Sequence, residues 1–361
     1  MSRIKVGIIG VGNCASGLIQ GVEFYRQKPD AGGLIHDKIG PYSTGDAEFV
    51  SAFDISESKV GKTLREAIYT QPNDVRWVEK VTGCNTVVRE SPILDGVGIF
   101  VEKMINPIKQ TKPIDDLRKD IIKEIEDTGT RVLMNYLPVG SQKATEFWAD
   151  VAVRTACAFI NCIPVFIASS ESWERRFKEK NIPVIGDDIK SQVGSTIVHR
   201  VLAKLCTDRG ALIDRTYQIN VGGNTDFINM LERQRLESKK ISKTEAVQSQ
   251  LGTRLKDQNI YIGPSDFIPF LGNRKLAFVR IEGRLFAEVP FNMELRLDVD
   301  DKSTSGGTAI DALRLAQLAL DRKIGGVLTY ASAYLMKHPP VQMSDNDARE
   351  QLDNWIKSKA E

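Results

Sequence analysis

Residues 4–17 read IKVGIIGVGNCASG, an apolar run that breaks into glycines and continues in small residues. Such a run is typical of a buried strand in a parallel sheet. Gly10, Gly12 and Ala15 then follow the G-x-G-x-x-G/A spacing of a dinucleotide-binding turn between strand and helix. In that turn the glycines permit a tight bend and a close approach to a pyrophosphate, which binds N–H groups at the helix N-terminus. The residues predicted to contact the cofactor here are Gly10, Gly12, Asn13 and Cys14.

Asp54 supplies a second signal, which is needed because a glycine-rich turn can also be purely steric. It ends the apolar run 49–53 and could accept hydrogen bonds from an adenosine ribose. An acid at this position favours NAD over NADP. The usual interval between turn and acid is about 20 residues. It is longer here because residues 26–46, with several prolines and glycines, intervene, and we interpret them as an inserted loop.

The composition is that of an ordinary globular protein. The chain has 361 residues, 42% of them hydrophobic and 27% charged, which is enough for two domains with a sizeable core. A net charge of +2 gives no overall attraction to nucleic acid or to an anionic membrane, so neither is an expected partner. Met-Ser-Arg leads directly into the first strand, and no apolar stretch approaches the ~18 residues of a membrane span. We therefore expect a cytoplasmic protein.

Cysteine and histidine offer few metal or nucleophile sites. The five cysteines contain no C-x-x-C pair, which is typical of reduced, buried thiols. Only three histidines are present, so a three-histidine metal site would need all of them, and a hydrolase would have few candidates for its base. His199 lies in a helical pattern and is expected to be packed or hydrogen-bonded.

The first half of the chain alternates between helix-like and strand-like patterns. In residues 115–128, Leu117, Ile121 and Ile125 recur on one face of a helix, and a strand-like run at 131–135 follows. Continued alternation of this kind predicts an α/β fold with a Rossmann-like, doubly wound parallel sheet.

Beyond residue 209 strand signals outnumber helices, at 217–221, 276–281, 285–289 and 292–299. The last of these alternates apolar and polar residues, the pattern of a sheet with one polar face. We predict a second α+β domain with a mostly antiparallel sheet, for catalysis and oligomerisation. The predicted limits are 1–195 for the NAD-binding domain, completed by 325–361, and 196–324 for the second domain.

Two lysines in the second half, Lys239 and Lys243, are four residues apart and would share one face of a helix. Lysine clusters are most often a solvated surface. They can also form a phosphate site or stabilise a developing oxyanion, since a lysine near other cations and apolar walls loses its proton more readily. Both interpretations stay open at this point.

Other charged residues are equally ambiguous when taken one at a time. Residues 187–191 read DDIKS after a strand, and could form a ligand site or the N-terminal cap of a helix. Residues 222–226 read GGNTD, and could be a plain turn or could direct Asp226 toward a nicotinamide. Lys275, Asp301 and Lys337 belong to no motif of their own.

Six longer stretches have one family in common: the chain resembles myo-inositol-1-phosphate synthase, also called inositol-3-phosphate synthase, of the shorter bacterial and archaeal type. The resemblance extends over nearly the whole length. Its marks are GVGNCAS at 10–16, NYLPVGS at 135–141, NCIPVFIAS at 161–169, GDDIKSQVG at 186–194, NVGGNTDFINMLE at 220–232 and ESKKISKT at 237–244.

The resemblance implies a reaction and a set of roles. The family converts D-glucose 6-phosphate to 1D-myo-inositol 3-phosphate by oxidation at C5, enolisation, intramolecular aldol closure and reduction, with NAD recycled in each turnover. The main catalytic or oxyanion-holding residues implied are Lys239, Lys243 and Lys275, with Lys190 and Lys337 assisting and Asp226 and Asp301 relaying protons or orienting lysines. The residues implied at the nicotinamide are Ser191, Asp226 and Lys239.

The resemblance leaves several features open. Many members carry an aspartate two positions before the lysine that matches Lys275, whereas this chain has Asn273. Some members depend on a metal ion near the nicotinamide and phosphate, and these residues do not identify one. A homotetramer is expected, with 292–299 as a possible interface strand. The alternatives are an ordinary NAD-dependent dehydrogenase that releases NADH and a non-catalytic NAD-binding regulator.

Overall fold

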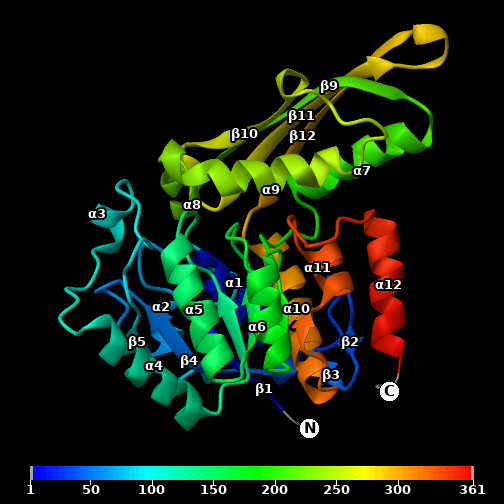
Figure 1. The fold of residues 1–361 in the computed structure, drawn as a ribbon. Helices are drawn as coiled ribbons and strands as arrows, with labels where there is room; N and C mark the ends of the chain where they lie inside the picture. Colours follow the sequence, from blue (N-terminus) through cyan, green and yellow to red (C-terminus); the bar gives the residue numbers. More distant parts are fainter. Residues whose placement is uncertain (1–2, 359–361) are drawn as a thin grey trace.

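The computed structural model describes residues 3–358, apart from the side chains of Pro264 and Ser303. It has two parts, each built on its own sheet (Figure 1). The larger part contains both ends of the described chain, and the smaller part contains most of residues 195–300.

The larger part is built on seven parallel strands, as predicted for a Rossmann-like fold. The strand order reverses between β1 and β6, and ligands bind at such a switch point, outside the carboxyl ends of the strands. In spatial order the strands are β13 (Gly326–Val327), β8 (Pro183–Ile185), β7 (Ala158–Asn161), β6 (Val132–Asn135), β1 (Ile4–Ile9), β4 (Ala47–Asp54) and β5 (Val88–Glu90).

Helices cover both faces of this sheet, and each face has its own apolar core. Ile4, Val6 and Ile8 of β1 pack toward one face, whereas Ile9 packs toward the other. The first face is covered by α1 (Asn13–Gln27), α10 (Ser303–Asp321) and α11 (Thr329–Leu335), with α12 (Asp345–Lys357) against α11. The second is covered by α4 (Ile114–Thr128), α5 (Gln142–Arg154) and α6 (Glu171–Glu179).

The position of α10 differs from the predicted domain limits. We expected residues 196–324 to belong to the second domain, yet α10 packs against α1 and against β7 and β8 of the parallel sheet. Its buried face, including Ala309, Leu313 and Ala316, supplies part of the first core. The packing of α10 therefore places it in the larger part, so the chain returns to that part before the predicted residue 325.

Short elements fill the connections of the larger part. The predicted insertion at 26–46 begins within α1 and continues as a loop and a small hairpin. The short elements are β2 (Lys38–Ile39), β3 (Tyr42–Ser43), α2 (Leu64–Ala67) and α3 (Glu102–Ile105).

The smaller part has a four-stranded sheet in the order β10, β9, β11, β12. Because β10 runs parallel to β9, this sheet is mixed. Helices α7 and α9 lie between it and the larger part (Figure 1). The elements are α7 (Ser195–Asp208), β9 (Leu212–Gly222), α8 (Thr225–Asn229), α9 (Glu237–Gln248), β10 (Ile260–Phe267), β11 (Arg274–Arg284) and β12 (Pro290–Asp300).

One predicted strand is wrong. Residues 285–289 form the turn between β11 and β12, where Ala287 and Glu288 both have positive φ. A strand cannot continue through two such residues, because left-handed backbone turns the chain back on itself. The strands predicted at 217–221, 276–281 and 292–299 are confirmed within β9, β11 and β12.

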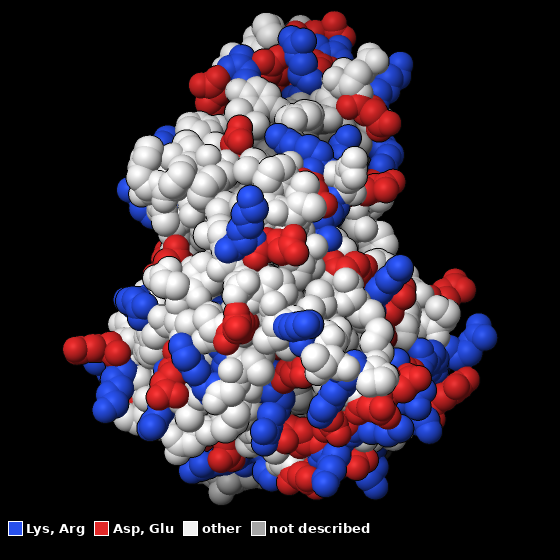
Figure 2. Space-filling model, turned by 90° about the vertical axis from the view of Figure 1, so that its left-hand side faces the viewer, with Lys and Arg blue, Asp and Glu red and all other residues white. Residues whose placement is uncertain are grey.

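The face in Figure 2 carries both signs of charge. Lys and Arg side chains alternate with Asp and Glu over the lower, larger part, and no broad area has one sign. Among residues 3–358, no helix is long and apolar enough to cross a membrane.

Candidate active site

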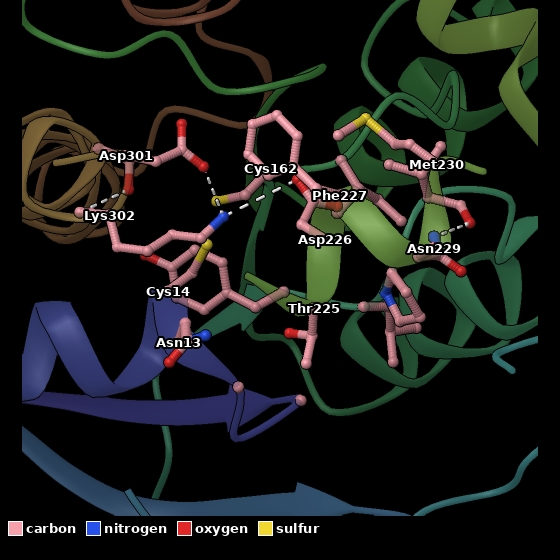
Figure 3. A pocket seen from close by; sticks show the side chains of 18 of the residues that line it. Asn13, Cys14, Cys162, Thr225, Asp226, Phe227, Asn229, Met230, Asp301 and Lys302 are labelled. Carbon is pink, nitrogen blue, oxygen red and sulfur yellow. Dashed lines mark hydrogen bonds and ion pairs between the residues drawn. The ribbon is translucent and has the colours of Figure 1, made fainter. Parts of the chain in front are cut away.

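One pocket lies between the two parts and is lined by residues from both. Its floor is the carboxyl end of β1 and the start of α1, and its opposite wall comes from α8, α9 and β11. Figure 3 shows Asn13 and Cys14 on the side of α1, with Asp226 on α8 and Lys302 at the start of α10 facing the same space. The pocket therefore lies at the switch point of the parallel sheet.

The predicted glycine turn forms the floor of this pocket. Gly10 has φ +85°, and a Cβ there would lie 2.9 Å from the carbonyl oxygen of Tyr136. A larger residue would therefore be strained and would also clash with backbone. At Gly12 a Cβ would meet nothing within 4 Å, so the backbone is open to the pocket. Helix α1 begins one residue later, as a phosphate site requires.

Asp54 holds the glycine turn in place. Its Oδ2 accepts a hydrogen bond of 2.6 Å from the N–H of Val11, and its Oδ1 accepts from the N–H groups of Ile55 and Ser56 at 2.8 Å. The buried Lys59 donates to the carbonyl of the same Val11 at 2.8 Å. Asp54 thus has a structural role in the turn. It also lines the pocket, and its contact with a ribose stays a prediction.

Four of the predicted lysines line the pocket together. Their roles as a phosphate site or as oxyanion-stabilising groups stay predictions. Lys239 and Lys243 are on one face of α9, Lys275 is on β11, and Lys337 follows α11. Burial lowers the pKa of Lys243 well below its usual value, and the charges of the other three lysines lower it further. Among the described residues, Lys243 has no hydrogen bond or ion pair from its ammonium group. It is the lysine best suited to be a neutral amine.

The buried Asp188 pairs with the partly buried Lys337 at 2.7 Å. Asp188 also accepts a hydrogen bond of 2.6 Å from Ser242 on α9. Burial alone would raise the pKa of Asp188, but the charges of Lys337 and Lys239 lower it below its usual value. The carboxylate therefore stays ionised and positions Lys337 and α9 in the pocket.

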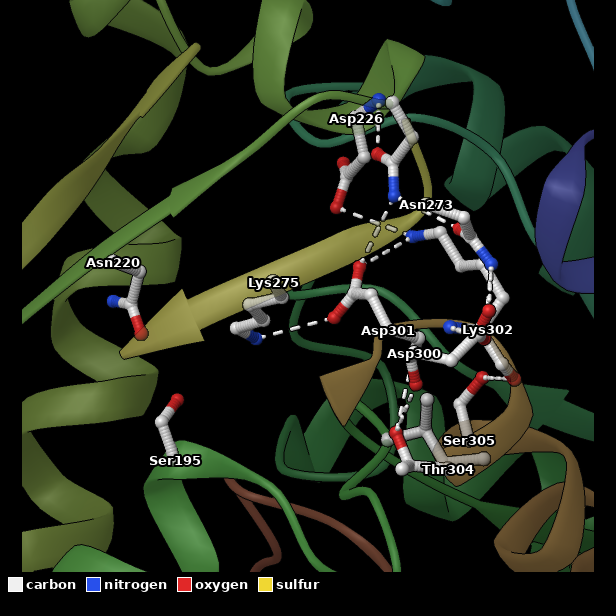
Figure 4. A network of polar contacts seen from close by, with 12 residues as sticks. Ser195, Asn220, Asp226, Asn273, Lys275, Asp300, Asp301, Lys302, Thr304 and Ser305 are labelled. Carbon is white, nitrogen blue, oxygen red and sulfur yellow. Dashed lines mark hydrogen bonds and ion pairs between the residues drawn. The ribbon is translucent and has the colours of Figure 1, made fainter. Parts of the chain in front are cut away.

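A second polar network links the two parts (Figure 4). Asp301 lies between two ammonium groups, 3.2 Å from Lys275 and 3.0 Å from Lys302. Asp226 lies 3.5 Å from Lys239 and 3.8 Å from Lys302. Burial raises the pKa values of both carboxyls, yet the neighbouring lysines lower the pKa of Asp226 below its usual value and that of Asp301 well below. The pKa of Lys302 is raised well above its usual value, because the charge of Asp301 outweighs burial.

Most residues singled out from the sequence line this pocket. The residues placed there are Gly10, Gly12, Asn13, Cys14, Asp54, Ser191, Asp226, Lys239, Lys243, Lys275, Asp301 and Lys337. The 187–191 segment is not a helix cap, because α7 begins only at Ser195.

Lys190, which was expected to assist the other lysines, does not line the pocket. Its ammonium donates to the carbonyl of Ala333 at 2.8 Å and to Asp345 at 3.0 Å. Complete burial and the charge of Arg200 lower its pKa to about 7. Lys190 thus joins α12 to α11, just before Lys337, and its assisting role stays a prediction.

Asn273 does not form the relay that an aspartate would provide. Its Nδ2 donates to both carboxylate oxygens of Asp300 at 2.9 Å. Lys275 takes its carboxylate partner from Asp301 instead. Lys275 therefore has a carboxylate partner. That carboxylate follows β12, whereas many family members carry it two positions before the lysine.

Two charged residues that line the pocket, Lys59 and Lys302, were not singled out from the sequence, whereas Asp188 belongs to the 187–191 segment considered there. Lys302 adjoins Asp301, so the DK pair in the sequence was the available signal. His199 is confirmed as hydrogen-bonded, to Thr216 and Gln218, and its burial lowers its pKa to about 4.

The floor of the pocket fits a dinucleotide. Asn13 is 4% exposed, and its Nδ2 has no hydrogen-bond partner among the described residues. An unsatisfied buried donor at the N-terminus of α1, beside the open backbone of Gly12, suits a pyrophosphate oxygen.

The pocket does not fit a bound metal ion in the same way. Among residues 3–358, no group of three or more His, Cys, Asp or Glu side chains is placed to hold one. Two of its carboxylates, Asp226 and Asp301, are paired with lysines instead.

Comparisons with known proteins agree with the resemblance. The family model described as myo-inositol-1-phosphate synthase matches residues 194–302. The inositol-3-phosphate synthase of Mycolicibacterium smegmatis is 48% identical over 361 residues, 98% of each chain. The chain belongs to the myo-inositol-1-phosphate synthase family. The inositol-3-phosphate synthase of Corynebacterium glutamicum is also 48% identical to this chain, over 363 residues and 98% of each chain.

A solved structure shares this fold. The myo-inositol-1-phosphate synthase-related protein from Thermotoga maritima superposes with a TM-score of 0.82 at 24% identity, covering 99% of this chain and 100% of that one. The likeness therefore extends over both parts of the chain, the part with the parallel sheet and the part with the smaller mixed sheet.

Proposed function

We propose that this chain is an inositol-3-phosphate synthase, which isomerises D-glucose 6-phosphate to 1D-myo-inositol 3-phosphate with NAD recycled in each turnover. The observation that carries the proposal is the arrangement around Lys243. A buried lysine without a partner among the described residues lies beside three other lysines, in the pocket that ends at the glycine turn of α1. Proton removal beside a carbonyl requires such a base, with cations that hold the resulting oxyanion.

The floor of the pocket would hold NAD. Gly10, Gly12 and Asn13 would receive the pyrophosphate, and Asp54 keeps the turn in the required shape. Ser191, Asp226 and Lys239 would lie at the nicotinamide end. When bound, NAD supplies a hydride acceptor for one carbon of the substrate and later a hydride donor for the same carbon.

The substrate phosphate would bind where α7 begins. Ser195 and Thr196, at the first turn of this 14-residue helix, line the pocket, and free N–H groups there attract a phosphate. Lys275 on β11 lines the same pocket and would add a positive charge.

Proton transfer would then fall to the remaining lysines. Lys243, as a neutral amine, takes a proton from the carbon beside the new ketone, while Lys239 and Lys337 hold the enolate oxygen. The Lys243 ammonium can return its proton to the alkoxide formed by aldol closure. Asp188 holds Lys337 in place throughout.

We also propose a homotetramer built through the outer face of the mixed sheet. Tyr217, Ile219, Tyr261 and Phe278 are exposed there, and the pairing of β9 with β10 and β11 places them on one face. Contiguous exposed apolar residues are typical of a protein interface.

The test is a product assay with the purified chain, glucose 6-phosphate and NAD. We expect inositol phosphate by mass spectrometry or NMR, with no net rise in absorbance from NADH. Steady accumulation of NADH would support an ordinary dehydrogenase and contradict the proposal. NAD binding without any product from glucose 6-phosphate would support a non-catalytic role.

A further inference from the structure

Lys302 lies where two partly buried carboxylates of the pocket converge. Its ammonium nitrogen is 3.0 Å from Asp301 Oδ2 and 3.8 Å from Asp226 Oδ2 (Figures 3 and 4). The two aspartates come from the end of β12 and the start of α8, and Lys302 is 6% exposed. A pair of aspartates aimed at one point is a common way to hold a hard cation such as Mg²⁺ or Mn²⁺.

We infer that Lys302 is a built-in cation that occupies the place of a metal ion between Asp226 and Asp301, so that catalysis needs no added metal. This inference rests on the proposed synthase function. It assigns to Lys302 the role of supporting negative charge on the reacting substrate, next to the cofactor turn.

The charge count around the two carboxylates supports this role. Three ammonium groups, those of Lys239, Lys275 and Lys302, face the carboxylates of Asp226 and Asp301, which gives a net charge of +1. A divalent ion at the same place would raise this charge further in a buried site, where repulsion is poorly screened. Both carboxylate oxygens of Asp301 pair with lysine ammonium groups, so Asp301 has little capacity left to coordinate a metal ion.

Helix stability does not explain a lysine at this position. Lys302 is the N-cap of α10, a helix of 19 residues. The N-terminus of a helix carries partial positive charge and favours anions, so a cation there is unfavourable. The side chain is therefore held by the two aspartates, and its charge is directed at the pocket rather than at the helix.

An ammonium can replace a metal ion in this reaction because the chemistry needs charge rather than activated water. A metal ion stabilises an oxyanion and can lower the pKa of bound water. No water attacks in an intramolecular aldol closure, and Lys243 would provide the base. A fixed ammonium then gives the remaining electrostatic stabilisation by hydrogen bonding and charge.

The first test uses the full wild-type chain. The protein is treated with EDTA in a buffer whose only cation is tetramethylammonium, its metal content is checked by mass spectrometry, and inositol phosphate formation is measured. We expect a rate within twofold of the untreated enzyme, and less than a twofold change on adding Mg²⁺, Mn²⁺, Zn²⁺ or K⁺. A loss of tenfold or more that one of these ions restores would overturn the inference.

The second test uses Lys302→Ala, which leaves space for a cation between the aspartates. We expect at least a hundredfold lower rate in EDTA, unchanged NAD binding, and at least tenfold recovery with millimolar Mn²⁺, whose binding electron paramagnetic resonance would detect. Lys240→Ala is the matched control, because Lys240 is an exposed lysine of α9 outside the pocket lining. Unchanged activity of Lys302→Ala in EDTA, or a loss that no cation restores, would contradict the role.

These outcomes are separable from the proposed function. If the wild-type chain forms no inositol phosphate under any condition, the synthase proposal fails. If it forms inositol phosphate only with a metal ion, the synthase proposal stands and the role of Lys302 is overturned. Thermal unfolding of Lys302→Ala identifies a variant that does not fold, and the wild-type test then decides alone.

Discussion

The ammonium nitrogen of Lys337 lies 2.7 Å from Oδ1 of Asp188, a residue 149 positions earlier in the chain. Their backbones are joined as well, since the N–H of Lys337 donates to the carbonyl of Asp188 at 2.7 Å. Asp188 also accepts from Ser242, which directly precedes Lys243 on α9. One buried carboxylate thus fixes two distant lysines relative to each other across the two parts of the molecule.

Asp188→Asn should separate the charge of Asp188 from its shape. Lys337 would lose its counter-charge, and a hydrogen bond to a charged group is worth about 1.5–3 kcal/mol. We expect kcat to fall about tenfold to a hundredfold while NAD binding changes little. Steady-state assays and NAD titration measure both. Asp266→Asn, at an exposed position of β10, is the control. A variant with unchanged kcat would show that Asp188 does not act through Lys337.

Lys243→Ala should abolish formation of inositol phosphate and leave NAD bound. The reason is that Lys243 is the buried lysine whose lowered pKa suits a base, while the glycine turn lies on a different element. General base catalysis contributes about 10²–10⁴-fold, so the rate should fall by at least a hundredfold. Detection of inositol phosphate checks the loss of activity, and calorimetric titration checks that NAD still binds. Lys240→Ala is the control. Near-normal turnover would remove Lys243 from the mechanism.

The acid limb of the pH profile should respond to Lys239. If Lys243 acts as a neutral amine, activity rises with pH as Lys243 loses its proton. Of the neighbouring charges, that of Lys239 contributes most to lowering the pKa of Lys243, after burial itself. Lys239→Met removes this repulsion, raises the pKa of Lys243 and should move the acid limb to higher pH, in addition to lowering the rate. A pH series of kcat/KM measures the shift, and an unmoved limb would argue for a different base.

Patterns within single elements were predictable, because they depend on local geometry. The apolar run and glycines of 4–17 specify a strand, a tight turn and a helix without reference to the rest of the chain. The four-residue spacing of Lys239 and Lys243 likewise placed both on one face of α9. The alternation in 292–299 correctly predicted β12.

Partners between distant elements were not predictable, because isolated charges look alike in a sequence. Asp188 meets Lys337 only because residues 186–190 run beside residues 335–338 in the folded chain. Lys302 becomes a buried cation only when α8 brings Asp226 to the start of α10. The sequence of β10 contains a glycine and a proline, which hid its strand pattern and its parallel pairing with β9.

We predict that copies of the chain associate through the outer face of the mixed sheet. Phe278 is 38% exposed and pairs in register with Ile219, which is 43% exposed. Phe278→Asp should weaken an interface on this face without disturbing the fold, because the side chain points away from α7 and α9. We expect four-chain particles for the wild type and smaller ones for the variant in size-exclusion chromatography with light scattering. Ile114→Asp, at an exposed position of α4, is the control. A tetrameric variant would place the interface elsewhere.

His36, in the inserted loop, predicts a pH-dependent contribution to stability. Its Nδ1 contacts Asp311 of α10, and its Nε2 lies 2.8 Å from Asp353 of α12. Arg314 and Arg349 lie in the same network, paired with these two aspartates. Burial alone would lower the pKa of His36, but hydrogen bonds from its ring to both aspartates raise it above its usual value. The charged imidazole therefore joins the loop to two helices of the larger part.

The sign of the effect follows from this raised pKa. Stabilisation by His36 is complete below its unfolded pKa of about 6.5 and is lost as pH rises through the higher folded pKa. His36→Ala should lower the free energy of unfolding by about 2 kcal/mol near pH 6, with a smaller difference above that folded pKa. Urea unfolding of both proteins across this range measures the difference. Lys38→Ala, at an exposed position of the same loop, should show no such dependence. A difference that grows with pH would mean that His36 is neutral in the folded chain, held by the aspartates through hydrogen bonds alone.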